Sequence, residues 1–186
     1  MLTELQTAKL THFFHILDYD CNGLIQRDDF EAVGENLAVM RGFDPGTEEY
    51  DTIMQSSLGI WDKLTQYVHG TDGSLSMWLS FIDSLVINSD DQWYNQYVNQ
   101  VVESLFDLFD EDKDGFISLD EYIDLFVGLR IEVRFAPKSF KNLDMNNDGQ
   151  ISRDEMVKAV KEFLKSDDPE AAGNWIFGSW AFGVDI

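Results

Sequence analysis

The chain has 186 residues, of which 44% are hydrophobic and 13% aromatic, and its formal net charge is −22. This apolar content is enough for a sizeable core, and the length suits one compact body or two small lobes. The charge argues against nucleic acid and anionic membrane surfaces, which would repel the chain, and no stretch approaches the ~20 apolar residues of a membrane helix.

The first residues predict a helix with a well-marked start. They contain neither a basic segment nor an unbroken apolar run, so we expect no secretory signal peptide. Thr3 and Gln6 are placed as a capping box, in which each side chain accepts a hydrogen bond from the other residue's backbone N–H. Apolar residues then recur at helical spacing, at Leu5, Leu10, Phe13, Phe14 and Leu17.

Residues 18–29 follow this helix and have the spacing of a calcium-binding loop. Such a loop curls around the ion, offers oxygens from positions 1, 3, 5, 7, 9 and 12, and has glycine at position 6. The candidate ligands are Asp18, Asp20, Asn22, the backbone carbonyl of Leu24, and Asp29. Position 12 holds Asp29 where glutamate is usual, and this shorter carboxylate reaches the ion less easily with both oxygens. We therefore expect magnesium to compete with calcium most strongly here.

Cys21 lies at position 4 of this loop, a position that supplies no ligand, and it is the one cysteine of the chain. A single cysteine excludes an internal disulfide and is consistent with a reducing compartment. We therefore expect a cytoplasmic location.

Residues 69–76 resemble a second loop that has lost its ligands. They lie between two helical patterns, and Gly73 aligns with position 6. The anchoring positions 1 and 12 then fall on apolar residues, Val68 and Leu79. We expect no ion in this loop, and we expect Leu75 to pair with Ile25 and so brace the first loop.

The segment 88–91 is the candidate boundary between two halves. It is short and has no proline or glycine, so it is no flexible tether, and the halves should pack on one another. A loop of this kind with the helix on each side of it is called here a hand. We expect an N-terminal pair of hands at 1–88, a C-terminal pair at 92–166, and an aromatic tail at 167–186.

The C-terminal half contains two further loops, 110–121 and 144–155, that fit the calcium pattern throughout. The candidate ligands of the first are Asp110, Asp112, Asp114, the carbonyl of Phe116, and Glu121, with Ser118 binding directly or through water. Those of the second are Asp144, Asn146, Asp148, the carbonyl of Gln150, and Glu155, with Ser152 in the same role. Ile117 and Ile151 at position 8 should pair the two loops through a short β-bridge. Together with the first loop, the sequence predicts three calcium sites.

The tail after Ser166 contains Trp175, Phe177, Trp180 and Phe182. These residues are too apolar for a free tail, so we expect them to fill the groove between the halves. Two alternatives are that they cover a pocket for a hydrophobic ligand or dock a partner.

The chain resembles the sarcoplasmic calcium-binding proteins of invertebrates and their bacterial relative calerythrin. The resemblance covers nearly the whole length and rests on the aspartate at position 12 of the first hand, the disabled second hand, the two intact C-terminal hands, and the aromatic residues at 174–178. It implies an all-α fold of four EF hands in two tightly packed pairs, with the tail packed in a shared core, and a role as a calcium and magnesium buffer. Luciferin-binding proteins and calcium-triggered photoproteins have a similar arrangement of hands.

Three kinds of calcium-binding protein fit these observations. A buffer binds ions and changes its surface little; a sensor exposes a methionine-rich groove to a target protein; a carrier releases an apolar small molecule on calcium binding. Dispersed methionines and a high aromatic content favour the buffer, because an adaptable groove needs clustered methionines. No catalytic constellation is present, so we expect no enzyme; we expect a monomer, and the sequence indicates no particular protein target.

Overall fold

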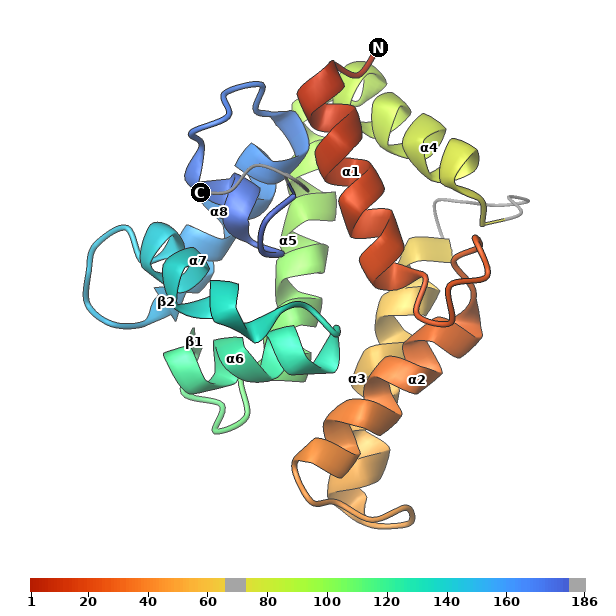
Figure 1. Ribbon diagram of the computed structural model, residues 1–186, viewed down its shortest axis with the longest axis vertical. Helices are drawn as coiled ribbons and strands as arrows, with labels where there is room; N and C mark the ends of the chain where they lie inside the picture. The colour runs from red at the N-terminus through yellow and green to blue at the C-terminus, as the bar shows by residue number, and fades with distance from the viewer. Residues whose placement is uncertain (66–72, 181–186) are drawn as a thin grey trace.

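Eight α-helices make up most of the part of the chain that the computed structural model describes, residues 1–65 and 73–180, with the backbone alone at 85–88 (Figure 1). They are α1 (Glu4–Leu17), α2 (Arg27–Met40), α3 (Glu48–Thr65), α4 (Leu75–Asn88), α5 (Asp91–Phe109), α6 (Leu119–Gly128), α7 (Ala136–Leu143) and α8 (Arg153–Lys165). Two short strands, β1 (Phe116–Ile117) and β2 (Ile151–Ser152), and two 3-10 helices, η1 (Val133–Phe135) and η2 (Ala172–Trp175), complete the described elements. The prediction of an all-α fold is confirmed.

The N-terminal helices begin and pack as local chemistry dictates. The capping box predicted for α1 is present, since the Gln6 N–H donates to Thr3 Oγ1 and the Thr3 N–H donates to Gln6 Oε1. Helices α2 and α3 approach closely at Gly34, where a Cβ would lie 2.9 Å from Met54 Sδ. At the same contact the Ser57 hydroxyl donates to the Phe30 carbonyl at 2.6 Å, which satisfies a buried polar group.

In the C-terminal half, β1 and β2 pair antiparallel with Ile117 opposite Ile151, so the predicted bridge at position 8 is confirmed. Both isoleucines are fully buried. This bridge fixes the register of the two flanking loops relative to each other.

The second hand corrects the sequence analysis by two residues. Leu24 pairs with Ser74, and the Ile25 N–H donates to the Gly73 carbonyl at 2.8 Å, so Gly73 and not Leu75 is the partner of Ile25. Ser74 is the residue that precedes α4, the place that position 9 takes in the other loops. Gly73 is therefore at position 8, and position 12 falls on Met77, which also lacks a carboxylate. Residues 66–72, which include Val68, lie outside the described residues.

Helices of the two halves pack on one another in several pairs. Helix α3 packs on α5, α2 on α6, and both α1 and α4 on α8. The connection between the halves is short, because α4 ends at Asn88 and α5 begins at Asp91, with the Asp90 side chain accepting from the Trp93 N–H at 2.8 Å.

The tail packs into this core through Ile176 and Phe177, which are buried, whereas Trp175 and Trp180 are only half-buried. The Phe177 ring stacks on Phe13 of α1 at 4.1 Å between centroids and meets Phe163 of α8 edge-on at 5.3 Å. Phe182 lies outside the described residues. Beside this cluster Lys9 is fully buried, and its ammonium donates to the Ser166 carbonyl at 2.9 Å and to Asn174 Oδ1 at 2.8 Å.

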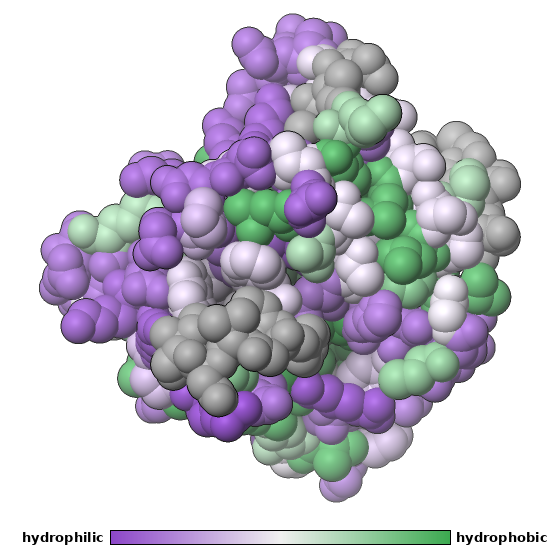
Figure 2. Space-filling view, turned by 45° about the horizontal axis from the view of Figure 1, so that its top comes forward, coloured by the Kyte–Doolittle hydropathy of each residue, from purple (hydrophilic) through white to green (hydrophobic). Residues whose placement is uncertain are grey.

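Hydrophilic side chains cover much of the face in Figure 2, and hydrophobic ones show in several places, many of them gathered in its upper middle. Within the described residues, the exposed large hydrophobic side chains come from different elements: Met1, Val39, Met77, Phe116, Leu119 and Val133. Over the same residues, no helix is both long and apolar enough to cross a membrane.

Candidate metal centres

The three loops at 18–29, 110–121 and 144–155, called here loop 1, loop 3 and loop 4, share one backbone conformation. Position 4 has a positive φ in each, and so does the glycine at position 6. The values at position 4 are 60° at Cys21, 59° at Lys113 and 59° at Asn147, and those at position 6 are 85° at Gly23, 87° at Gly115 and 87° at Gly149. Such angles favour glycine, which explains the residue at position 6. Loop 1 therefore has the same turn as the two C-terminal loops despite its different position 12.

The position-1 aspartate of each loop accepts the N–H of the position-6 glycine. The nitrogen–oxygen distances are 2.9 Å for Asp18, 3.1 Å for Asp110 and 3.0 Å for Asp144. The position-5 side chain in turn accepts a hydrogen bond from the backbone N–H of position 7. The N–H of position 7 is then satisfied within the loop, and its carbonyl is the backbone group that can bind an ion. These bonds run from Leu24 to Asn22, from Phe116 to Asp114 and from Gln150 to Asp148.

The position-12 carboxylate folds back over each loop and accepts from the N–H groups of positions 2 and 9. In loop 1, Asp29 accepts from Tyr19 at 2.8 Å and Gln26 at 2.7 Å. In loop 3, Glu121 accepts from Glu111 and Ser118, both at 2.8 Å. In loop 4, Glu155 accepts from Met145 at 3.0 Å and Ser152 at 2.9 Å. Asp29 thus reaches the same two amides as the longer glutamates.

Glu121 and Glu155 also belong to the capping boxes that start α6 and α8. Burial by itself would raise the pKa of each carboxyl, but hydrogen bonds from the serine at position 9 and from loop amides hold both pKa values below the usual range. Both groups are therefore ready as anions, the form that binds a cation.

Acidic oxygens converge in loops 1 and 3. Carboxylate oxygens of Asp18, Asp20 and Asp29 lie within 4.8 Å of one another, as do those of Asp110, Asp112 and Asp114. Burial and then repulsion from Glu121, Asp114 and Asp112 raise the pKa of Asp110, against a hydrogen bond from Gly115. In loop 4, which has Asn146 at position 3, the remaining acids form no such group among the described residues.

The residues fit a calcium ion. Asp110 Oδ1 is buried and has no hydrogen-bond partner within the described residues, although a buried acceptor is normally satisfied. A hard divalent cation is the natural partner for an oxygen surrounded by other carboxylates. Asp110, Asp112, Asp114 and Glu121 would hold the ion together with the Phe116 carbonyl.

Two functional contacts were not anticipated from the sequence. Arg41 and Arg130 each reach a loop of the opposite half, and no spacing rule marks either residue. Both lie near the end of a helix that leaves a loop, where a cation is favourable for the helix alone.

Comparison with known proteins agrees with this geometry. An EF-hand family model matches residues 102–127 and 138–161, which contain loops 3 and 4. Calerythrin of Saccharopolyspora erythraea is 29% identical over 166 residues, covering 88% of this chain and 94% of that protein. The coelenterazine-binding protein of Renilla muelleri, in its calcium-loaded apo form, superimposes with a TM-score of 0.79 at 26% identity, covering 96% of this chain and 99% of that one.

A sarcoplasmic calcium-binding protein of Perinereis vancaurica tetradentata is 32% identical over 137 residues, covering 74% of this chain and 76% of that protein. The chain therefore belongs to the family of sarcoplasmic calcium-binding proteins and calerythrin, and it is a calcium-binding EF-hand protein.

Proposed function

We propose that this chain is a calcium and magnesium buffer that holds three ions, one in each of loops 1, 3 and 4. The observation that carries the proposal is the conformation common to the three loops, with the same left-handed positions and the same hydrogen bonds to the position-12 carboxylate. A monomer in the cytoplasm, where free calcium is buffered, suits this role.

Magnesium should compete most at loop 1, because Asp29 is one methylene shorter than Glu121 and Glu155. A carboxylate that binds with one oxygen leaves a shell closer to the six-coordinate arrangement that magnesium requires. The exposed Asp20 and Asn22 can yield to ions of either size.

A buffer is favoured over a sensor by the way the tail joins the halves. Phe177 is in contact with Phe13 and Phe163, which come from opposite halves. Opening a groove in either half would break these contacts as well as the pairing inside that half. A sensor of the calmodulin type has to expose such a groove on binding calcium.

The experiment combines stoichiometry with shape. Calorimetric titration with calcium should give three ions per chain, and solution scattering should give the same curve for the magnesium-loaded and calcium-loaded forms. A count of two or four would contradict the ion assignment. A calcium-dependent expansion, or a large rise in hydrophobic-dye fluorescence over the magnesium form, would favour the sensor.

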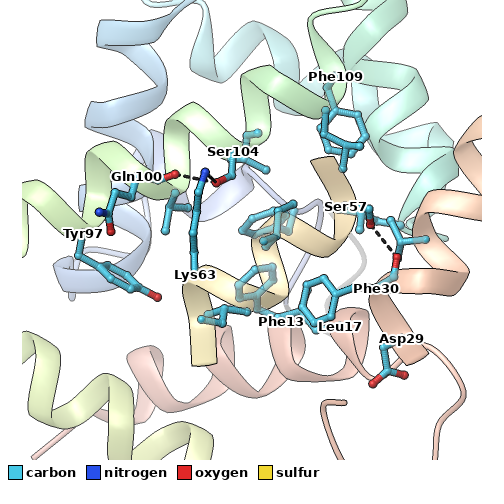
Figure 3. A pocket seen from close by; sticks show the side chains of 18 of the residues that line it. Phe13, Leu17, Asp29, Phe30, Ser57, Lys63, Tyr97, Gln100, Ser104 and Phe109 are labelled. Carbon is cyan, nitrogen blue, oxygen red and sulfur yellow. Dashed lines mark hydrogen bonds between the residues drawn. The ribbon is translucent and has the colours of Figure 1, made fainter. Parts of the chain in front are cut away.

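A second candidate is a carrier of an apolar small molecule, and a cavity between the halves favours it. The cavity has a volume of about 100 Å³ and is lined mainly by apolar side chains of α1, α2, α3 and α5 (Figure 3). An apolar cavity of about 150 Å³ can hold a benzene molecule, so this smaller cavity would have to widen to take a ligand with one aromatic ring. The similar Renilla protein is named for the coelenterazine that it binds.

One side of the cavity is polar. Lys63 Nζ donates to Ser104 Oγ at 2.8 Å, and that hydroxyl donates to the Gln100 carbonyl at 2.8 Å. Within residues 1–65 and 73–180, no carboxylate lies within ion-pair distance of Lys63. An aromatic ligand with one acceptor oxygen would match both parts of the cavity.

Phenol and toluene make a matched pair of probes for the carrier. Phenol should bind more tightly, and its advantage should disappear in Lys63→Met, while Val101→Phe should fill the cavity and weaken both. Binding is measured by calorimetry and by the fluorescence of Trp78, which lines the cavity. Coelenterazine is the third probe. If none of the three binds at millimolar concentration, the carrier is excluded.

A further inference from the structure

Arg41 joins the N-terminal half to loop 3. It follows the last residue of α2, and its side chain is only 7% exposed. Its guanidinium donates to the carbonyls of Leu108 and Phe109 at the end of α5, at 3.2 and 3.4 Å, and its Nε lies 3.3 Å from Glu111 Oε2. Glu111 is position 2 of loop 3. The arginine thus binds the residues on both sides of Asp110, the first ligand candidate.

Arg130 makes the reciprocal connection from the C-terminal half to loop 1. It follows α6, donates from Nη1 to the Tyr19 carbonyl at 3.0 Å, and places its guanidinium carbon 3.5 Å from the centre of the Tyr19 ring. Tyr19 is position 2 of loop 1. The arginine of each half therefore binds position 2 of a loop in the other half.

The backbone at the two helix ends supports a role for Arg130. Both helices end in the same turn, in which the left-handed residue is Gly42 after α2 and Arg130 after α6, with φ of 78° and 55°. A side chain in this region costs about 1 kcal/mol relative to glycine. Arg130 occupies the position that glycine would take more cheaply, and its side chain makes the contact with Tyr19.

These contacts close a ring through both halves. The position-2 N–H of each loop donates to the position-12 carboxylate, from Tyr19 to Asp29 and from Glu111 to Glu121. Asp29 lies in the first turn of α2, which ends at Arg41, and Glu121 lies in the first turn of α6, which ends before Arg130. The two helices also pack on each other, and the Asn36 amide of α2 donates to the Val127 carbonyl of α6 at 3.3 Å.

We propose that Arg41 and Arg130 are positioning residues that couple calcium binding in loop 1 to calcium binding in loop 3. An ion in loop 1 fixes Asp29 and hence the start of α2, which holds Arg41 against loop 3. An ion in loop 3 fixes Glu121 and hence the start of α6, which holds Arg130 against loop 1. The coupling is positive, because each ion orders contacts that the other site also needs. The proposal depends on calcium binding in these loops and not on whether the chain is a buffer or a carrier.

The test needs a signal from each loop separately. The N–H groups of Gly23, Gly115 and Gly149 donate to the position-1 aspartates, so their amide resonances report on loops 1, 3 and 4 in one calcium titration of the full chain. Loop 1 is disabled with Asp20→Ala. In the otherwise unchanged protein, Asp20→Ala should raise the calcium dissociation constant of loop 3, followed at the Gly115 amide, by about 10-fold. This is within the usual range of coupling between sites.

In a protein that also carries Arg41→Met and Arg130→Met, Asp20→Ala should raise the calcium dissociation constant of loop 3 by less than about 2-fold. Arg134→Met with Lys158→Met is the control, because both side chains are exposed and neither belongs to an ion loop, and it should keep the full effect. If the protein with both arginines changed to methionine does not fold, Arg41→Lys with Arg130→Lys replaces it. Lysine keeps the charge but lacks the forked donors of arginine, so the effect of Asp20→Ala on loop 3 should still be smaller than in the starting protein.

An effect of the same size with and without the two arginines would overturn the proposal, and so would the absence of any effect of Asp20→Ala on Gly115 in the starting protein. Either result would leave three ion sites in place. A failure of Gly115 and Gly149 to respond to calcium at all would instead contradict the proposed function.

Discussion

The N-terminal and C-terminal pairs of hands hold their loops together in different ways. In the C-terminal pair, two loops that fit the calcium pattern at every position are joined by buried isoleucines, Ile117 and Ile151. In the N-terminal pair, Ile25 is hydrogen-bonded to Gly73, which has no side chain and belongs to a hand without the anchoring carboxylate. Loop 1 nevertheless has the same backbone as the other two. A brace made of backbone alone is sufficient to shape an ion loop.

Substitutions of the position-12 glutamates should have the largest effect, and they test the C-terminal pair of hands. Glu121→Gln and Glu155→Gln should each remove one calcium site, because one oxygen and the charge that close the shell are lost. A penalty of about 3 kcal/mol corresponds to about 100-fold in the dissociation constant. Titration calorimetry gives the number of sites, with Glu103→Gln on the exposed side of α5 as the control. An unchanged stoichiometry in either loop variant would show that the carboxylate is not a ligand.

The glycine brace is the corresponding test of the N-terminal pair. In Gly73→Ala, the new Cβ would lie 2.4 Å from the Ile25 carbonyl oxygen, and φ is +74°. We expect a loss of about 2 kcal/mol in the free energy of unfolding and weaker binding in loop 1. Loops 3 and 4 should change less.

Gly59→Ala is the control for that substitution, because Gly59 lies in α3 and nothing is within 4 Å of its added Cβ. It should be neutral or stabilising by about 0.5–1 kcal/mol. Chemical denaturation at saturating calcium measures both variants. If Gly73→Ala is as stable as Gly59→Ala, the backbone brace is not important.

Asp29→Glu should make loop 1 more like the C-terminal loops. The longer side chain can offer both oxygens, so the preference for calcium over magnesium at this loop should rise by about 10-fold, or about 1.4 kcal/mol. Competition titrations followed at the Gly23 amide measure the ratio. The neighbouring Asp28 lies in the same helix turn but is exposed, so Asp28→Glu should leave the ratio unchanged. If the two variants have the same ratio of calcium to magnesium affinity, the length of the position-12 side chain does not set the ion selectivity of loop 1.

The smallest effect concerns Lys9, which joins the two halves away from the ions. Burial lowers its pKa to about 8, against the attraction of Asp167 and Glu162. Between pH 8 and the pKa of the unfolded chain, the unfolded state therefore binds more protons, so stability rises with pH. The unfolding free energy of the calcium-loaded protein, minus that of Lys9→Met, should be constant below pH 8 and rise above it by about 1 kcal/mol for each pH unit. A difference that falls over this range would contradict the direction of the shift.

The sequence predicts the ion loops well, because spacing alone determines which oxygens can reach one ion. Asp18, Asp110 and Asp144 each receive the glycine N–H that the pattern demands. The register of the second hand was wrong by two residues, since the pattern has little to fix it once the carboxylates are missing. Gly73 was assigned the turn position that Gly23 and Gly115 occupy, whereas it serves as the pairing residue.

Contacts between the halves could not be predicted for a different reason. Arg41, Arg130 and Lys9 are charged residues whose partners include backbone carbonyls distant in the sequence, and every residue has a carbonyl. Spacing along the chain therefore carries no information about which one is chosen. Only the packing of α2 on α6 and of α1 on α8 brings these groups together.

The ammonium of Lys9 holds the end of α8 and the tail at the same time, through Ser166 and Asn174. A protease that cut the chain between these two residues would free Asn174 and leave a buried cation short of a partner. The first helix of the protein would then loosen together with its last segment. Resistance of the tail to digestion is thus a simple gauge of whether the whole body is closed.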